Sequence, residues 1–355
     1  MQRQIDKRLV KLKERGIQLY SISKLNTMEQ CPYQAYLNYV LHEKQTSNCW
    51  CNLGSAIHDA LQLCIDEPTT DTKVIAEAVE DELENLDISG TDFPNDRNGN
   101  PTIRENWIAN MMRFAKEFKI PKGNFETEQL CILPINDHAA MHGYIDLIRH
   151  NNDGSLWIVD WKTSSQFDKA HLLSAGRQLI FYALAKRAEG YTVNKVSWVM
   201  LKYCVTSWTL KNGKTKEKVS EWRNYIKDLK NVLEKKLSDA GYDEIDIECY
   251  LSEAEKLNSM DKLPAEIRDQ FKTQIYVRDY ELTDELVQET MDYINKQIEA
   301  YESKGADEKN YPPCDISKNS FFCASLCGYG KSKCPHYQDY CEQFVKDDDD
   351  DDDLF

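Results

Sequence analysis

Acidic, basic and amide side chains follow one another over a short part of the chain at spacings that suit phosphodiester chemistry. Asp146 is followed by Asp160 and Lys162, which are separated by one residue, and then by Gln178 and Tyr182, which are four positions apart. Hydrolysis of a phosphodiester needs one or two hard cations that polarise the phosphate and activate water. Mg²⁺ and Mn²⁺ prefer carboxylate oxygens, and a nearby lysine stabilises charge on the phosphate.

Three β-rich runs and one helix are predicted to position these side chains. The runs 126–135, 139–150 and 156–163 are separated by turn residues and predict a three-stranded meander, and a helix is expected over 169–189. Asp160 and Lys162 should share one face of the third strand, because side chains alternate along a strand. Asp-x-Lys alone is more often a surface salt bridge, but here it accompanies Asp146 and the helical Gln178 and Tyr182.

The rest of the chain predicts a helical frame around a mixed sheet. Alternating helical and strand patterns indicate an α/β fold. Helices are expected at 24–40, 54–65, 72–87, 104–118, 218–240 and 283–303, strands at 195–203 and 274–282, and a hairpin at 207–216, while 241–272 is ambiguous.

Cysteine is frequent, with twelve residues among 355. In the cytosol disulfides are disfavoured, so a group of cysteines indicates metal binding. Soft thiolates in fours suit zinc or an iron–sulfur cluster. The last 42 residues hold Cys314, Cys323, Cys327, Cys334 and Cys341.

The order of these motifs resembles the RecB-like branch of the PD-(D/E)XK nuclease superfamily. The resemblance implies a restriction-endonuclease-like α/β core with a mixed central sheet and a metal-dependent nuclease activity. The matching pairs are Gly54 and His58, Gly143 and Asp146, Asp160 and Lys162, and Gln178 and Tyr182.

The resemblance also implies a metal site and its ligands. His58, Asp146 and Asp160 would hold Mg²⁺ or Mn²⁺. The backbone carbonyl of Val159 or Trp161 could complete the coordination shell. A lone histidine in a helix is more often structural, so the assignment of His58 depends on the other motifs.

Four further residues have expected roles around that metal. Lys162 would orient the attacking water and stabilise charge, while Gln178 and Tyr182 would position the nucleic-acid strand or the lysine. Glu128, on the first strand of the meander, is either a further acidic contributor or a surface carboxylate.

The cysteines resemble the iron–sulfur staple of the same branch, in which one cysteine near the N-terminus joins three near the C-terminus. That group includes the CRISPR-adaptation nucleases, and the segment from Cys327 to Tyr337 resembles nucleases of phages and mobile elements. We expect Cys31, Cys327, Cys334 and Cys341 to bind a 4Fe-4S cluster, with zinc or free thiols as alternatives. The gaps between the last three are wider than the family usually has, so Cys323 could replace one of them. Such a cluster would join residues about 300 apart in sequence and hold the helical frame.

We therefore expect four regions. A helical region (1–120) carries Cys31 and His58, a nuclease core spans 121–305, a Cys-rich segment (306–345) closes onto the N-terminal region, and an acidic disordered tail covers 346–355. The expected activity is a deoxyribonuclease, acting as an exonuclease on single-stranded or frayed DNA ends in recombination, repair or replication of a phage or mobile element. The alternatives are a DNA-end-binding subunit with a silent site and an iron–sulfur or zinc protein that does not bind nucleic acid.

Charge and hydropathy limit the partners. The net charge is −16, and seven of the negative charges form one run, Asp347 to Asp353, followed by Leu354 and Phe355. A nuclease must therefore supply local positive surface, and the acidic tail could dock a replication or recombination protein. No run of about 18 apolar residues is present, so we expect a cytoplasmic protein without membrane contact, in a bacterium or a phage-infected host.

Overall fold

The three predicted β-runs form the expected meander. The computed structural model describes residues 6–96 and 98–350, with side chains described up to residue 343. Strands β2 (Asn124–Pro134), β3 (Ala139–His150) and β4 (Leu156–Lys162) are joined in antiparallel order. Asn136 and Asp153 form the two turns, because their carboxamide and carboxylate oxygens accept hydrogen bonds from nearby backbone N–H groups.

Seven strands make up one mixed sheet, as predicted for this α/β fold. Strand β1 (Gln18–Tyr20) lies parallel to β3, and β5 (Val193–Thr209) lies parallel to β4. Strands β6 (Thr215–Glu221) and β7 (Phe271–Tyr280) both run antiparallel to β5. The hairpin expected around Asn212 and Gly213 joins β5 to β6.

A fork in the sheet lies beside β3. Strand β2 occupies one edge of β3 along nearly its whole length. On the other edge, β1 pairs with Ala139–Met141 and β4 pairs with Leu147–His150. Residues 142–146 therefore have no strand partner on that edge among the described residues. The predicted ligand Asp146 lies where β3 and β4 separate.

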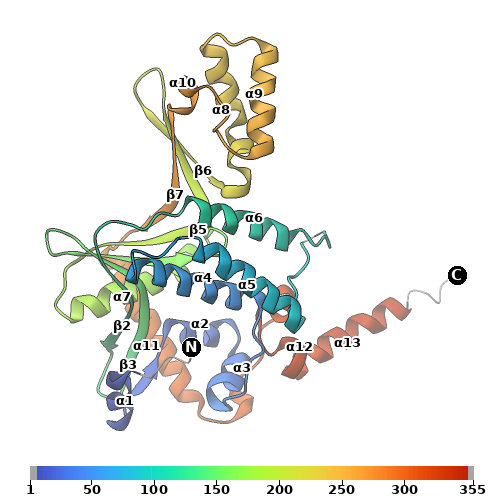
Figure 1. Ribbon diagram of the computed structural model, residues 1–355. Coiled ribbons are helices and arrows are strands. Elements are labelled where there is room, and N and C mark those ends of the chain that lie inside the picture. The colour runs from blue at the N-terminus through green and yellow to red at the C-terminus, as the bar shows by residue number, and fades with distance from the viewer. Residues whose placement is uncertain (1–5, 97, 351–355) are drawn as a thin grey trace.

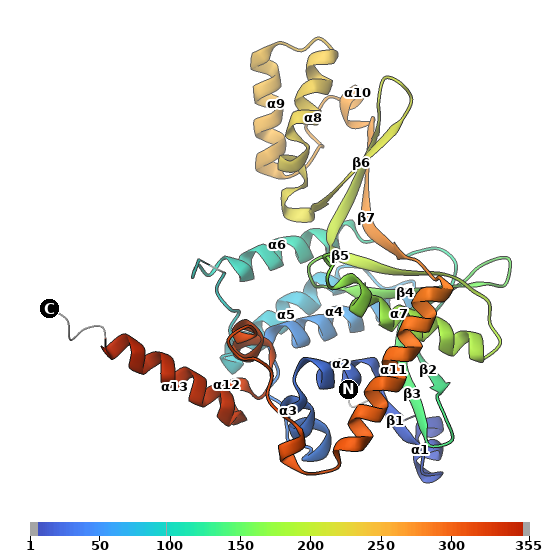
Figure 2. The same ribbon diagram turned by 180° about the vertical axis from the view of Figure 1, so that it is seen from behind.

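Helices cover both faces of the sheet (Figure 1). One core joins the sheet to α4, α5 and α6, and the other joins it to α7 and α11, as Figure 2 shows from behind. The helices are α1 (Lys7–Glu14), α2 (Ile22–Gln30), α3 (Pro32–Ala35), α4 (Cys49–Asp66), α5 (Val74–Ser89), α6 (Thr102–Glu117), α7 (Leu172–Ala188), α8 (Tyr225–Asp239), α9 (Glu244–Leu257), α10 (Ala265–Arg268), α11 (Asp284–Lys304), α12 (Gly330–Lys333) and α13 (Pro335–Asp350).

Two predicted helices differ from the structure for physical reasons. The helix expected over 24–40 ends at Gln30 and resumes at Pro32, because proline lacks an N–H and is tolerated only in the first turn. The start of the helix expected over 218–240 is strand instead, because Lys218 to Glu221 pair with Tyr203 to Thr206. The ambiguous segment contains α9 and α10, and Thr283 caps α11 as predicted.

Residues 205–272 form a lobe that projects from the core (Figure 1). It consists of the β5–β6 hairpin, helices α8 to α10 and the beginning of β7. Strands β5 and β7 run from the core into the lobe, so the sheet itself connects the two.

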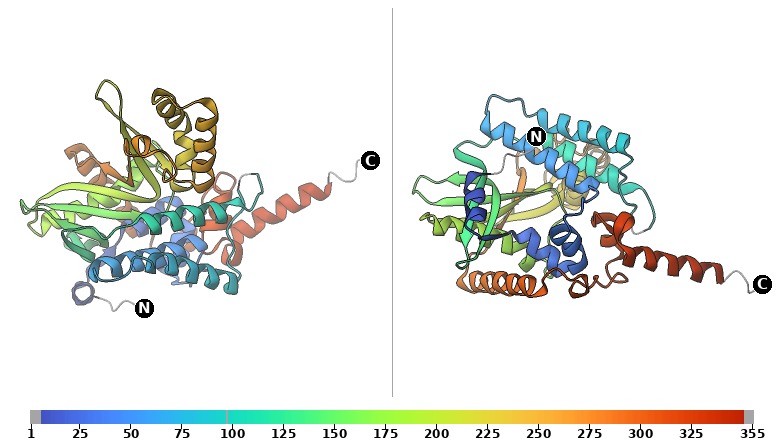
Figure 3. Two further views of the ribbon diagram at one scale, coloured as in Figure 1. Left: turned by 45° about the horizontal axis from the view of Figure 1, so that its top comes forward. Right: turned by 90° about the horizontal axis from the view of Figure 1, so that it is seen from below.

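The C-terminal segment returns to the N-terminal region. Tyr33 donates its backbone N–H to Pro312 at 3.2 Å, and Thr46 does the same to Gly328 at 3.0 Å. The Tyr329 hydroxyl donates to the Glu43 carbonyl at 2.7 Å. Helix α13 then extends away from the rest of the chain (Figure 3).

The acidic tail differs in part from its expected disorder. The backbone of residues 346–350 continues helix α13, which begins at Pro335 with a proline suited to the first helical turn. The remaining tail residues, 351–355, lie outside the described residues. Within the described ranges, none of the helices has the length and apolar composition that a bilayer crossing demands.

Candidate metal centre

Three potential ligands from three elements meet at the sheet fork. A nitrogen of His58, on α4, and carboxylate oxygens of Glu128 and Asp146, on β2 and β3, all lie within 4.8 Å of one another. Glu128 lies opposite Asp146, between the pairs Thr127–Leu147 and Gln129–Ile145. One imidazole and two carboxylates form a donor set that suits a divalent cation.

Glu128 reaches this group from an unusual backbone conformation. Its φ is 50°, in the left-handed region that non-glycine residues seldom adopt. Such a conformation costs about 1–3 kcal/mol and is concentrated at functional sites. The strain therefore falls on the residue of β2 that faces the candidate metal ligands.

Asp146 is buried, and its carboxylate is held by the backbone N–H of Trp161, which lies beyond the part of β4 that pairs with β3. Its Oδ2 accepts a hydrogen bond from the Trp161 N–H at 2.7 Å and lies 3.7 Å from His58 Nδ1. Burial, and then the charge of Asp160, raise the pKa of Asp146 well above its ordinary value. A cation at this position would favour the ionised carboxylate, so the residues present fit a divalent metal.

Asp160 and Lys162 lie on the face of β4 that α7 covers. Lys162 Nζ lies 2.7 Å from Asp160 Oδ2 and donates to Gln178 Oε1 at 3.2 Å. Gln178 Nε2 donates in turn to the Tyr182 hydroxyl at 2.8 Å. Although burial lowers the pKa of Lys162, the neighbouring Asp160 carboxylate outweighs it and the pKa is raised. Lys162 is therefore held as an ammonium group.

The Asp160 carboxylate retains capacity for another partner. Its Oδ2 is buried and has no hydrogen bond of regular geometry among the described residues, although it is close enough to Lys162 for an ion pair. Lys162 compensates the charge of this buried oxygen, and a carboxylate has the lone pairs to bind a further cation as well. Asp160 thus fits a second contribution to a metal site, beside the group formed by His58, Glu128 and Asp146.

His58 is suited to bind metal as a neutral imidazole. Burial lowers its pKa, and this effect exceeds the opposing influence of Asp160. The imidazole ring meets the Trp161 ring edge-on, with centroids 5.5 Å apart. Trp161 therefore orients His58 with its side chain and Asp146 with its amide.

The glycine in the Gly143–Asp146 motif has a packing function. A Cβ at Gly143 would lie 3.0 Å from Phe181 and 3.1 Å from Tyr182, both on α7. The absence of a side chain allows α7 to approach β3 closely. The motif thus sets the distance between the strand that carries Asp146 and the helix that carries Gln178 and Tyr182.

The structure brings the predicted site residues together with one difference in grouping. Glu128, left open from sequence, belongs with His58 and Asp146, whereas Asp160 pairs with Lys162. Trp161 contributes its N–H, and Val159 packs in the core with Leu147. Coordination by the Val159 or Trp161 carbonyl stays a prediction.

Five cysteines gather where the C-terminal segment meets α2 and α3. Cys31 shares one buried cluster with cysteines of the C-terminal segment, and the sulfurs of Cys314 and Cys323 are 3.8 Å apart. Burial, and then charge on Cys31 and Cys323, raise the pKa of Cys314. The other members of the group are Cys327 and Cys334.

Cys341 lies apart from this group. It is exposed on α13, where it interacts with Tyr337.

The buried cysteines of the group are disfavoured as thiolates. Burial raises the pKa of Cys327 to about 11. A bound cation would be needed to favour thiolates in such a buried set, and soft sulfur donors suit zinc or iron. In the sequence, Cys323 could be recognised as a possible ligand because it lies only four residues before Cys327. No feature of the sequence distinguished Cys314 as a ligand.

Close backbone packing holds the cysteine segment. A Cβ at Gly330 would lie 1.9 Å from the Cys323 carbonyl oxygen. The Gly330 N–H also donates to the Cys327 carbonyl at 3.3 Å. Glycine is therefore required where the chain passes between two of the cysteines.

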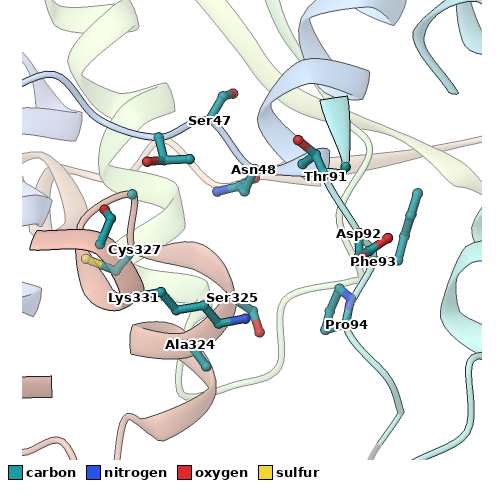
Figure 4. A pocket seen from close by; sticks show the side chains of 14 residues that line it. Ser47, Asn48, Thr91, Asp92, Phe93, Pro94, Ala324, Ser325, Cys327 and Lys331 are labelled. Carbon is teal, nitrogen blue, oxygen red and sulfur yellow. The ribbon is translucent and has the colours of Figure 1, made fainter. Parts of the chain in front are cut away.

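A pocket of about 310 Å³ lies beside Cys327 (Figure 4). Its wall combines the start of α4, the loop after α5 and the C-terminal segment, with hydroxyls of Ser47, Thr91 and Ser325 and the ammonium of Lys331. It contains none of the residues of the candidate metal centre.

Comparison with solved structures identified a likeness to a protein described as the crystal structure of SSO0001. The sequences are 14% identical, and the match covers 71% of this chain and 86% of that chain with a TM-score of 0.22, which is too low to support an argument. Comparison with curated proteins found no match.

A family model assigns the chain to a protein family. The model described as the PD-(D/E)XK nuclease superfamily matches residues 20–329. This stretch contains the complete candidate metal centre, from His58 to Tyr182, and Cys31, Cys323 and Cys327. The chain belongs to the PD-(D/E)XK nuclease superfamily and is a metal-dependent nuclease.

Proposed function

We propose that this nuclease acts on DNA and degrades single-stranded or frayed ends as an exonuclease. The observation that supports it best is the meeting of His58, Glu128 and Asp146 beside the Asp160–Lys162 ion pair. Oxygen and nitrogen ligands lie next to a fixed ammonium, which is the combination that phosphodiester hydrolysis uses. The order of the motifs, which resembles RecB-like nucleases, supports DNA as the substrate.

The residues around the site divide the chemical work. A bound Mg²⁺ or Mn²⁺ supplies Lewis acidity toward a phosphate oxygen and lowers the pKa of water. Lys162 stabilises negative charge that develops on the phosphate, while Gln178 and Tyr182 keep its ammonium in place. Asp146 itself is buried, so its charge acts on a bound cation at a lower effective dielectric than in bulk water.

We further propose that Cys31, Cys323, Cys327 and Cys334 bind a 4Fe-4S cluster. Cys323 takes the place first expected for Cys341, because it is buried and its sulfur lies 3.8 Å from that of Cys314, whereas Cys341 is exposed. Cys314, the fifth sulfur of the group, is the alternative ligand to Cys323. The cluster would be structural, since it would tie the C-terminal segment to the start of α3. Zinc in the same site is the outcome that metal analysis would distinguish.

The proposed biological setting is recombination, repair or replication of a phage or mobile element in the cytoplasm. It is supported by the resemblance of the C-terminal cysteine segment to nucleases of such elements. The acidic run from Asp347 is proposed to dock a replication or recombination protein.

Cleavage of end-labelled DNA tests the proposed activity. We expect the protein to shorten linear single strands and frayed duplexes with Mg²⁺ or Mn²⁺ but not with EDTA, and to leave circular single strands intact. Asp146→Asn should reduce the rate by about a thousandfold or more, because the charge that holds the metal is lost. Asp153→Asn, in the exposed turn of the same meander, should not.

Each other outcome has a definite meaning. Cleavage of circular strands would make the enzyme an endonuclease, and preference for RNA would remove the DNA assignment. Binding of DNA ends without cleavage by the wild-type protein would favour a binding subunit with a silent site. In an active enzyme, Lys162→Ala should abolish cleavage while DNA binding persists.

A further inference from the structure

One part of the projecting lobe is positively charged, although the lobe as a whole (residues 205–272) has 13 basic and 14 acidic side chains. Residues 211–236 contain nine lysines and arginines and four acidic residues, whereas the complete chain has a net charge of −16. Most of these basic side chains are exposed on the β5–β6 hairpin and on α8. A local positive surface on an acidic protein indicates attraction to a polyanion.

Several of these lysines line one groove between the hairpin and α8. The groove encloses a pocket of about 580 Å³. Lys216, on β6, and Lys235, on α8, are exposed and have no ion-pair or side-chain hydrogen-bond partner among the described residues. The remaining polar lining consists of Lys211, Asn212, Asn231, Lys236 and Asp239.

The local structure explains why the lysines gather there. Lys216 and Lys218 follow the two-residue period of β6, so they share one face of the hairpin, and Lys214 immediately precedes the strand. Lys216 pairs across the hairpin with Trp208, whose buried indole lines the same pocket. On α8, Lys235 comes one helical turn after Asn231, which also faces the groove.

The neighbouring groove of the lobe has the opposite character. Between α8 and α9 the lining includes Glu234, Glu244, Glu248 and Glu255. Its only lysine, Lys230, is paired with Glu255 at 2.9 Å. The two grooves of the lobe therefore differ in charge, and the groove on the hairpin side of α8 is the one that suits an anionic partner.

Strand β5 connects this groove directly to the candidate metal centre. Met200 pairs with Lys162 at one point of the strand, and Trp208 pairs with Lys216 eight residues further on. At about 3.3 Å per residue this separation is at most about 26 Å, since β5 is irregular between Met200 and Cys204. That length corresponds to up to about eight nucleotides at the rise of one duplex strand. Lys202, half-buried, lies between the two points.

We propose that the groove between the β5–β6 hairpin and α8 binds the phosphate backbone of the DNA strand at about this distance from the cleaved bond. The inference rests on the proposed DNA nuclease function and adds a second contact site to it. The groove contributes affinity rather than catalysis, because it contains none of the residues of the metal centre. It should therefore act only on substrates long enough to reach it.

Neutralising the two free lysines tests this site in the full-length protein. The test variant is Lys216→Gln with Lys235→Gln. The matched control is Lys256→Gln with Lys262→Gln, two exposed lysines near α9 in the same lobe that lie outside the groove. Fluorescence anisotropy with a labelled 30-nucleotide strand in EDTA, at several KCl concentrations, measures binding without cleavage.

We expect the test variant to bind the strand at least fivefold more weakly and to lose about 1.4 from the slope of log K against log salt, because two phosphate contacts disappear. With Mg²⁺, KM for the 30-nucleotide strand should rise while kcat and the kinetics on a dinucleotide stay unchanged. The control variant should behave as the wild-type protein in each assay.

An unchanged Kd and slope in the test variant, or an equal change in the control, would overturn the inference. Equal losses on the dinucleotide and on the long strand would also overturn it, because they would indicate a disturbed metal centre. If the wild-type protein binds DNA through these lysines but cleaves nothing, the proposed activity fails and the binding site stands. A melting temperature within the wild-type range excludes misfolding as the cause.

Discussion

Glu128 departs from regular strand geometry at the position that faces Asp146. A glutamate there with φ of 50° is tolerated only if the surrounding structure holds it. Its carboxylate lies with the His58 imidazole and the Asp146 carboxylate in a potential ligand group. Burial, then the charge of Asp160 and, to a smaller extent, the charge of Glu128 raise the pKa of Asp146. Two close carboxylates are unfavourable by themselves and favourable around a cation.

Glu128→Gln should therefore weaken metal binding more than it affects folding. We expect the Mg²⁺ or Mn²⁺ concentration at half-maximal cleavage to rise by about tenfold or more. Glu126→Gln is the control, because Glu126 lies on the same strand and pairs with His150 at 3.1 Å instead. Titration of the metal in a cleavage assay measures the effect; equal behaviour of the two variants would assign Glu128 to the surface.

Single strands and helices were predictable where the residue pattern that specifies them lies within the element itself. The β-rich run after the turn residues 151–154 predicted β4, and the alternation of side chains along a strand predicted the shared face of Asp160 and Lys162. Thr283 predicted the start of α11. The fork was not predictable, because it depends on where β1 and β4 pair along β3. For the same reason the sequence left Glu128 open, since its backbone conformation follows from that packing.

The C-terminal cysteine segment had a sequence signal that only its packing could resolve. From spacing, Cys323 was an alternative to any one of Cys327, Cys334 and Cys341. In the fold, Cys323 lies in the π-helical turn Phe322–Leu326, where it is buried beside Cys314 and Cys31, whereas Cys341 is exposed on α13. The Gly330 backbone against the Cys323 carbonyl fixes this arrangement.

The two alternatives predict opposite results for matched substitutions. Cys323→Ser should lose most of the bound iron and its absorption near 400 nm, because one of four soft ligands is removed. Cys341→Ser should retain both, since that thiol is exposed and outside the group. Iron analysis of anaerobically purified protein measures the outcome. Retention of iron by Cys323→Ser together with its loss in Cys341→Ser would restore the set first expected from the sequence.

At the scale of the whole molecule, the C-terminal cysteine segment packs against the N-terminal region, next to helix α4, which carries His58. Cys31 precedes α3, and the C-terminal segment reaches the loop before α4 through Thr46 and Asn48. Helix α4 begins at that loop and carries His58 to the sheet fork. The cysteine group and the metal centre are thus connected through one helix.

A metal bound by the cysteines should therefore stabilise the molecule globally. Joining residues about 300 apart restricts the unfolded chain by up to about 5 kcal/mol in the loop-entropy estimate, although contacts such as Tyr329 to Glu43 already retain part of this closure. We expect Cys31→Ser to lower Tm by about 5 °C or more. Cys249→Ser, an exposed cysteine on α9, should leave Tm unchanged. Scanning calorimetry of both variants, each with its iron content measured, decides the question: equal Tm values despite lost iron would mean that protein contacts alone hold the two ends together.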